Sequence, residues 1–157
     1  SVHRFSRDNA RTPMQWTRGT HSGFTTGLPW LPVEHDRTYT VENEAENADS
    51  VLSYYRRLAK QRAEIECLTA GDYTELLTAD ESIYAFRRTL GAEATVTLVN
   101  FTAETASYDA DLVRGMNRLV DSYPTDAQAD EEPGILRPFE AVVYTTVATL
   151  AQPFQEQ

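Results

Sequence analysis

The fold prediction for this chain starts from Ser6-Arg7-Asp8-Asn9-Ala10-Arg11-Thr12-Pro13-Met14-Gln15-Trp16. The stretch gathers cations, amides and an aromatic ring in a segment that has neither helical nor strand periodicity. Arginine and amide groups can donate hydrogen bonds to neighbouring sugar hydroxyls, and an aromatic face can lie against the apolar face of a pyranose ring. This composition predicts a polar loop that is suited to sugar binding.

The overall composition limits the class of protein and its partners. Of the 157 residues, 41% are hydrophobic and 24% are charged, which is typical of a globular protein. No apolar run approaches the roughly 20 residues that span a bilayer, so no membrane partner is expected. The net charge of −10 argues against nucleic acid, because phosphate binding depends on clustered Lys and Arg.

The sequence predicts neither a disulfide nor a metal site, and no cofactor. Cys67 is the single cysteine, which is typical of a reducing compartment and predicts a packing role and a cytoplasmic location. His3, His21 and His35 lack partners at metal-ligand spacing. Since the chain opens on Ser1 and not on Met, we interpret it as beginning partway through a longer protein.

A helix is predicted after a long loop region. The first 48 residues lack sustained periodicity and are expected to be mostly loop. Residues 49–65 then carry apolar side chains at helical spacing, at Val51, Leu52, Tyr55, Leu58 and Ile65. Asp49 or Ser50 can cap this helix, because a side-chain oxygen there accepts from an unpaired backbone N–H.

Beyond Gly71 the pattern changes to that of short strands. We expect them at residues 73–77, 83–88, 95–101, 106–110, 118–120 and 141–147. Within residues 95–101, alternation places Val96, Leu98 and Asn100 on one face, and both faces carry apolar residues, which predicts a central strand. Regularly spaced short strands predict an antiparallel β-sandwich.

The polar and aromatic residues of this second half indicate no site. Asp109, Asp111 and Asp121 form no recognisable pair and are expected on the solvated surface, and residues 121–132 are interpreted as an exposed loop. The aromatic residues are expected to alternate into the core instead of forming an exposed platform. An independent carbohydrate-binding module is therefore kept only as an alternative.

The opening stretch resembles a known family. Residues 6–16 are similar to the substrate-side loop of the oligo-1,6-glucosidase and α-glucosidase branch of the α-amylase superfamily, glycoside hydrolase family thirteen. Further similarities follow in the family's order at residues 50–58, 71–73, 99–102 and 136–141. The resemblance implies a mixed fold: residues 1–70 form the C-terminal end of a (β/α)8 barrel, with the substrate loop and the last helix, and residues 71–157 form an antiparallel β-sandwich domain.

The resemblance also implies an activity. It indicates a retaining α-glucosidase that hydrolyses short α-gluco-oligosaccharides, with α-1,6 linkages preferred. Such enzymes need two carboxyl groups about 5–5.5 Å apart, and this sequence contains none of the family motifs that supply them. We therefore expect the missing N-terminal barrel of the same protein to carry the catalytic residues, and the fragment alone to be inactive.

The resemblance assigns substrate binding to two arginines. Arg7 is expected to contact the hydroxyls of the glucosyl unit that is cleaved, and Arg11 to help hold the geometry of that site. Asp8 is expected to orient them, with Asn9 and Gln15 in support. Guanidinium suits this role because it donates two parallel bonds and stays charged. The alternative is a surface pair that braces the loop through Asp8, with amides that bond the loop to itself.

Other functions remain open at this level. Maltase, trehalose-6-phosphate hydrolase, sucrose isomerase and trehalose synthase belong to the same branch and share this loop. A non-catalytic relative, such as the heavy subunit of an amino-acid transporter, would keep the fold for partner binding.

Overall fold

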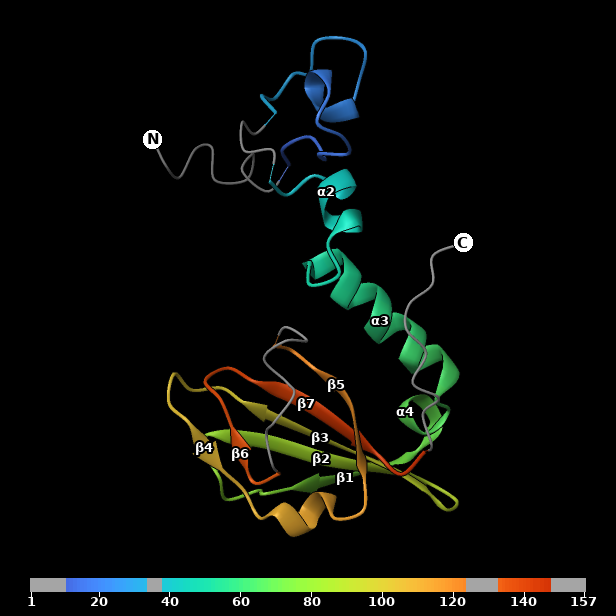
Figure 1. Ribbon diagram of the computed structural model, residues 1–157, viewed down its shortest axis with the longest axis vertical. Helices are drawn as coiled ribbons and strands as arrows, with labels where there is room; N and C mark the ends of the chain where they lie inside the picture. Colours follow the sequence, from blue (N-terminus) through green and yellow to red (C-terminus); the bar gives the residue numbers. More distant parts are fainter. Residues whose placement is uncertain (1–10, 34–37, 124–132, 148–157) are drawn as a thin grey trace. The chain divides into compact units, whose positions relative to one another are not determined.

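The computed structural model describes residues 11–33, 38–123 and 133–147 of the chain (Figure 1). The chain divides into two compact units, Ser1–Arg57 and Leu58–Gln157. This division falls inside helix α3, Val51–Glu64, and the predicted domain boundary between residues 70 and 71 stays a prediction. Within the described ranges no helix is long and apolar enough to cross a membrane.

The first unit is mostly loop, as predicted, with two short helical elements before α3. The 3-10 helix η1 covers Thr20–Gly23, and α2 covers Val41–Glu46. Helix α2 contradicts the expectation of loop over residues 41–46. Its sequence is acidic and lacks an apolar stripe, so periodicity gives no signal. The signal lies in its cap. Thr40, the residue before the helix, is fully buried, and its side chain accepts a hydrogen bond from the Asn43 N–H.

Helix α3 confirms the predicted helix and its cap. The Ser53 N–H donates to the Ser50 hydroxyl at 3.1 Å, which pairs one of the free N–H groups of the first turn. No residue of α3 is buried. Val51 and Tyr55, two members of the predicted apolar stripe, are 78% and 70% exposed. The stripe therefore exists, but within the described chain these two side chains are not covered.

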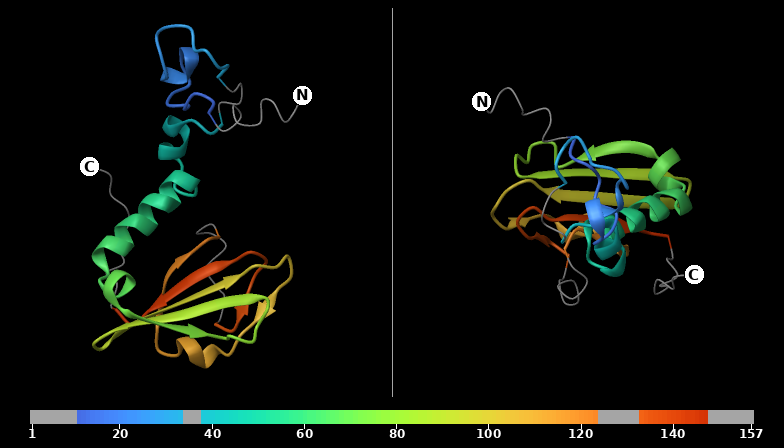
Figure 2. Two further views of the ribbon diagram at one scale, coloured as in Figure 1. Left: turned by 180° about the vertical axis from the view of Figure 1, so that it is seen from behind. Right: turned by 90° about the horizontal axis from the view of Figure 1, so that it is seen from above.

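The second unit is built on antiparallel strands (Figures 1 and 2). A five-stranded sheet has the order β1-β2-β3-β7-β5, and a two-stranded sheet pairs β4 with β6. The bounds are β1 Asp72–Leu76, β2 Ile83–Leu90, β3 Glu93–Asn100, β4 Ala106–Ser107, β5 Asn117–Asp121, β6 Ile135–Leu136 and β7 Ala141–Thr145. Five of the six predicted strands are confirmed, and β3 is central. The strand predicted over residues 106–110 is confirmed only at Ala106–Ser107, because a 3-10 helix begins at Ala110. The sequence missed β6, because two residues are too few to show alternation.

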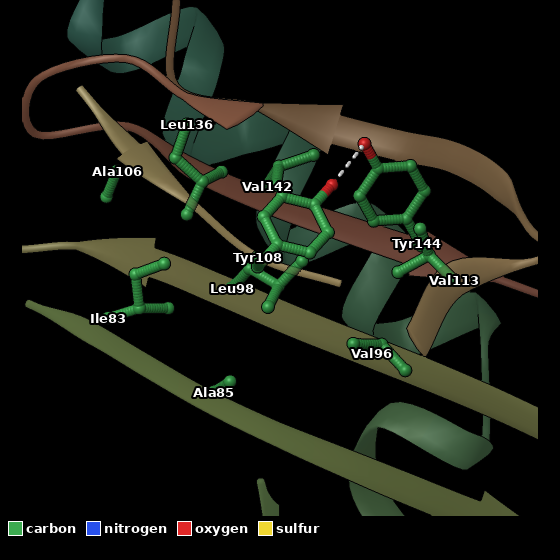
Figure 3. Close-up of a cluster of buried hydrophobic side chains, with 10 residues drawn as sticks. All are labelled: Ile83, Ala85, Val96, Leu98, Ala106, Tyr108, Val113, Leu136, Val142 and Tyr144. Carbon is green, nitrogen blue, oxygen red and sulfur yellow. Dashed lines mark hydrogen bonds between the residues drawn. The ribbon is translucent and has the colours of Figure 1, made fainter. Parts of the chain in front are cut away.

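The core of this unit lies on one face of the five-stranded sheet (Figure 3). Val96 and Leu98 of β3 are fully buried there, as the alternation predicts. Side chains from β2 and β7 on this face pack with others from the β4-β6 pair and from the 3-10 helix η2, Ala110–Val113. The Tyr108 hydroxyl donates to the Tyr144 hydroxyl at 3.2 Å, so the buried tyrosine pair is hydrogen-bonded within the core.

A tight junction joins helix α4, Cys67–Ala70, to β1. Cys67 is fully buried, and its Sγ lies 3.4 Å from the Arg88 carbonyl oxygen, which agrees with the predicted packing role. At Gly71 an added Cβ would lie 2.6 Å from the Cys67 carbonyl oxygen and 3.1 Å from the Thr89 nitrogen. Glycine is needed here because the backbones approach closely; the φ of −65° is open to any residue.

Asp121 corrects the expectation of a solvated acid. It ends β5 with a fully buried side chain, and its carboxylate pairs with Arg118 at 2.8 Å and Arg137 at 3.2 Å. Asp109 and Asp111 are exposed, as expected. The pairing with Arg137 could not be predicted from sequence spacing, because Arg137 lies 16 residues away from Asp121.

Candidate functional site

The candidate sugar-binding loop is described from residue 11 onward. Arg7, Asp8 and Asn9 lie outside the described residues. Arg11 is exposed, and it makes no hydrogen bond or ion pair with any residue of the described ranges. Gln15 is half-buried. Of the predicted site residues, the structure therefore describes only Arg11 and Gln15, and within the described ranges no hydrogen bond joins these two. It also shows what holds the described part of the loop.

Backbone hydrogen bonds tie the loop to helix α2. The Val41 N–H donates to the Gln15 carbonyl at 2.9 Å, and the Glu42 N–H donates to the Trp16 carbonyl at 3.0 Å. These N–H groups belong to the first turn of α2, where a helix has no acceptor of its own. The loop thus serves as part of the helix cap, and the backbone at residues 15 and 16 is fixed by it.

The loop also bonds to itself in a tight turn. The Ser22 carbonyl accepts from the N–H groups of Trp16 at 2.8 Å and Thr17 at 3.0 Å. Ser22 is fully buried and has a φ of +52°, in the left-handed region that few residues other than glycine adopt. Its hydroxyl lies 3.5 Å from the Gln15 amide oxygen. The Gln15 side chain is therefore turned toward its own loop, as in the alternative in which the amides bond the loop to itself.

Arg18 braces the loop against α2, and the sequence did not single it out. Its backbone N–H donates to Glu42 at 2.9 Å, and its guanidinium bonds to Asn43 and, at 2.9 Å, to Glu46. Because Arg18 and Glu46 are more than half exposed, the ion pair contributes little stability by itself. The contacts nonetheless give the loop a cation that holds it in place, a task that the alternative interpretation assigned to Arg7 and Arg11.

Large apolar side chains of the first unit are exposed. Before α3 these include Leu28 at 92%, Trp30 at 78% and Tyr39 at 69%, and Trp16 and Phe24 are about half exposed. Phe24 lines an open depression together with Thr20, Gly23, Thr25 and Thr26. Exposed apolar groups in this number are typical of a surface that contacts a ligand or another protein segment.

One pair of acids in the described ranges is buried. Asp121 and Glu140 do lie close together, but their side chains are 0% and 1% exposed and cannot reach a sugar. No group of His, Cys, Asp and Glu within the described ranges could hold a metal ion. The described part of the loop carries a hydrogen-bond donor in the exposed Arg11 guanidinium. Backbone hydrogen bonds hold the loop at Gln15 and Trp16.

A second surface lies on the sheet of the second unit. Tyr73 and Tyr84 are 50% and 40% exposed, and their hydroxyls are 3.0 Å apart. Phe86 lies next to both rings, with centroid distances of 5.4 and 5.6 Å. The hydrogen bond to Tyr84 raises the pKa of Tyr73 to about 12. The expectation that the aromatic residues all alternate into the core was wrong for these three.

Comparison with known proteins identifies the family. Residues 1–71 match the model of the α-amylase catalytic domain. These residues belong to the α-amylase family. The matched residues include the loop and all of α3, and end where the five-stranded sheet of the second unit begins.

Several glucosidases are among the relatives of this chain. It is 36% identical over 142 residues to an oligo-1,6-glucosidase of Parageobacillus thermoglucosidasius, which covers 88% of the chain. A trehalose-6-phosphate hydrolase of Escherichia coli strain K12 is 36% identical over 139 residues. The chain spans only about a quarter of the length of these relatives, 25% in both cases.

Solved structures of the family share the fold. The trehalulose synthase MutB from Pseudomonas mesoacidophila MX-45 is 34% identical and superimposes with a TM-score of 0.72, over 88% of this chain and 26% of that one. An inactive double mutant of MutB in complex with isomaltulose is 32% identical, with a TM-score of 0.74 over 92% of this chain and 27% of that one.

Proposed function

We propose that the chain is part of a retaining α-glucosidase that hydrolyses short α-gluco-oligosaccharides, with α-1,6 linkages preferred. The observation that carries this proposal is the 36% identity to oligo-1,6-glucosidases over 88% and 92% of the chain. The MutB structures bound to sucrose and to isomaltulose support a sugar as the ligand class. A cytoplasmic location stays a prediction from the single cysteine.

The proposal assigns a place in the enzyme to each part of the chain. Residues 1–70 would form the end of the catalytic barrel, and the exposure of Val51 and Tyr55 on α3 is what a helix shows when its packing partner lies elsewhere in the protein. Residues 71–157 would form the β-sandwich domain. The packing of the β4-β6 pair against one face of the five-stranded sheet supports that part.

In this proposal Arg7 and Arg11 bind the sugar, with Asp8, Asn9 and Gln15 in support. Two features of the described loop favour sugar contact for Arg11: it is exposed, and no described residue satisfies its guanidinium. The anchoring of Gln15 and Trp16 to α2 gives the loop the fixed backbone that a binding group requires.

The chemistry itself falls to carboxyl groups outside this chain. In a retaining enzyme one carboxylate attacks the sugar and the other protonates the leaving oxygen, at a separation of about 5–5.5 Å. We expect the purified 157-residue chain to show no turnover of p-nitrophenyl α-glucoside. Measurable hydrolysis by the chain alone would contradict this division of tasks.

A related activity is the second candidate. The identity to the trehalose-6-phosphate hydrolase of Escherichia coli equals that to the oligo-1,6-glucosidases, and MutB is a trehalulose synthase. Incubation of the full-length protein with isomaltose, maltose, trehalose 6-phosphate and sucrose separates these activities. Fastest turnover of isomaltose supports the proposal, and fastest turnover of another substrate replaces it.

Substitution of Arg11 in the full-length protein tests the binding role. Since a hydrogen bond from a charged donor contributes about 1.5–3 kcal/mol, Arg11→Ala should lower kcat/KM about 10- to 100-fold. Arg18→Ala is the matched control, because Arg18 faces α2 and bonds there. Equal losses in both variants would show that Arg11 acts only through the loop structure.

A further inference from the structure

A groove lies on the face of the five-stranded sheet opposite the core. In β3, Val96 and Leu98 are buried in the core, whereas Thr97 between them lines the groove. The second half of α3 and helix α4 also line it, and every lining residue belongs to the second unit. The groove has a volume of about 380 Å³, which is within the range of pockets that hold small molecules.

Three aromatic side chains line this groove: Tyr73 of β1, and Tyr84 and Phe86 of β2. The ring planes of Tyr73 and Phe86 are tilted by 32°, and those of Tyr84 and Phe86 by 47°. Because the two tyrosines are about half exposed, the groove has an accessible aromatic surface. The sequence-based expectation against a carbohydrate-binding surface relied on all such rings being in the core, and these three rings remove that reason.

Two arginines bring hydrogen-bond donors to the groove. Arg88 Nη1 donates to the Gly71 carbonyl at 2.8 Å and to the Thr69 carbonyl at 3.4 Å. Arg62 Nη1 donates to the Leu68 carbonyl at 2.9 Å. A guanidinium has five N–H donors. The remaining donors of both arginines have no partner among the described residues, and both guanidiniums are held in place by the bonds that they make.

Gln61 brings an acceptor that lacks a donor. Its side-chain nitrogen donates to the Leu119 carbonyl at 3.1 Å, which joins α3 to β5 across the groove. Its Oε1 is buried and accepts no hydrogen bond from any described residue. A buried polar atom without a partner is costly. A hydroxyl of a bound ligand would supply the missing donor.

These features together fit a sugar better than other ligand classes. A pyranose has an apolar face for the aromatic rings, and its hydroxyls can accept from Arg88 and donate to Gln61 Oε1. A purely apolar ligand would leave both polar groups unpaired. The net charge of −10 favours a neutral ligand over an anionic one.

We propose that the groove is a second carbohydrate-binding site, which holds a glucosyl unit of an α-gluco-oligosaccharide between the three aromatic rings and the polar groups of Arg88 and Gln61. It shares no residue with the candidate sugar-binding loop. Since none of its lining residues is acidic, it binds sugar without cleaving it. The choice of glucose units rests on the proposed function, whereas the groove and its chemistry do not.

Titration of the 157-residue chain with millimolar isomaltotriose, followed by NMR, tests the site. The amides of β1 and β2 should shift, and Tyr84→Ala should raise the Kd about tenfold. Phe101→Ala is the matched control, because Phe101 is 65% exposed but does not line the groove; it should keep the Kd of the unaltered chain. Shifts confined to residues 11–33, or an unchanged Kd in Tyr84→Ala, would overturn the proposal. The shift map needs no variant, so it decides even if Tyr84→Ala does not fold.

The full-length protein tests whether the groove is accessible in the whole enzyme. Electrophoresis through a gel that contains dextran, an α-1,6-glucan, should retard the unaltered protein. Tyr84→Ala should lose most of this retardation and keep its turnover of isomaltose, whereas Arg11→Ala should lose turnover and keep the retardation. If isomaltose is not a substrate at all, a loss of retardation in Tyr84→Ala still supports the groove. Absence of retardation in the unaltered protein, or equal retardation of Tyr84→Ala, would overturn it.

Discussion

The two units of the chain differ in where their large apolar side chains lie. In the second unit, Val96, Leu98 and Val142 are all but fully buried in one core. In the first, Leu28 and Trp30 are largely exposed, and order comes from backbone hydrogen bonds between the loop and α2. The second unit therefore holds its own hydrophobic core, whereas the described residues of the first unit form no such core and present their large apolar groups outward.

The same leucine deletion in the two units should give the largest contrast. Leu98 is fully buried, so Leu98→Ala should lower the free energy of unfolding by about 2–5 kcal/mol. Leu28 is 92% exposed, so Leu28→Ala should change it by less than about 0.5 kcal/mol. Chemical denaturation of the 157-residue chain measures both. A comparable loss at Leu28 would mean that the loop unit has a core of its own.

Alanine substitutions at two glycines, Gly71 and Gly27, should give the next largest difference in stability. The Cβ of Gly71→Ala would lie 2.6 Å from a backbone oxygen, so the α4–β1 junction must shift, at a cost of about 1–3 kcal/mol. At Gly27 the nearest group to an added Cβ is the Thr25 hydroxyl at 3.8 Å, an ordinary contact. Thermal unfolding should therefore show a lower Tm for Gly71→Ala alone. Equal Tm values would indicate that the junction yields more easily than its distances imply.

Removal of the α2 cap should act locally on the first unit. Thr40→Ala deletes the hydroxyl that accepts from the Asn43 N–H, a loss of about 1 kcal/mol. Because Gln15 and Trp16 accept from the same helix turn, exchange at the amides of Val41 and Glu42 should accelerate, while β3 amides stay protected. Thr40→Ser keeps the oxygen and should restore most of the protection. If β3 amides also accelerate, the two units unfold together.

The smallest expected effect is pH-dependent and lies in the turn before β2. The Asp80 carboxylate accepts from the Ser82 hydroxyl at 2.7 Å and from the N–H groups of Ser82 and Ile83, and these bonds lower its pKa. Its contribution is present above the usual pKa of the acid and is lost as the pH falls through the lowered value. Asp80→Asn should therefore have a slightly lower Tm at pH 7 and the wild-type Tm at pH 2. A difference that persists at pH 2 would point to a cause other than charge.

Sequence patterns predicted the elements whose signal is repeated over many residues. The alternation through β3 gave a central strand with Val96 and Leu98 buried, and the helical spacing after Ser50 gave α3. Elements that depend on a single cap or on distant partners were missed. Helix α2 relies on Thr40 and on carbonyls from a loop about 25 residues earlier, and β6 is only two residues long.

For the candidate site too, the sequence predicted what a local motif encodes and missed what depends on distant partners. A dense motif at residues 6–16 was enough to indicate the family, which the match over residues 1–71 then established. The bracing by Arg18 and the burial of Asp121 were not predictable, because both depend on pairing across 16 to 28 residues. Side-chain chemistry shows what a residue can bind, and only the tertiary structure shows which partner it meets.

The backbone hydrogen bonds between the loop and α2 have a consequence for how the exposed side chains of the loop can be changed. Since carbonyl groups of Gln15 and Trp16 make these bonds, they survive almost any substitution at those two positions. The hydrogen bonds that hold the loop backbone therefore do not depend on its exposed side chains, and these side chains can be substituted without loss of the bonds to α2. A directed-evolution library at exposed positions such as Trp16 and Phe24 should accordingly retain a high fraction of folded members.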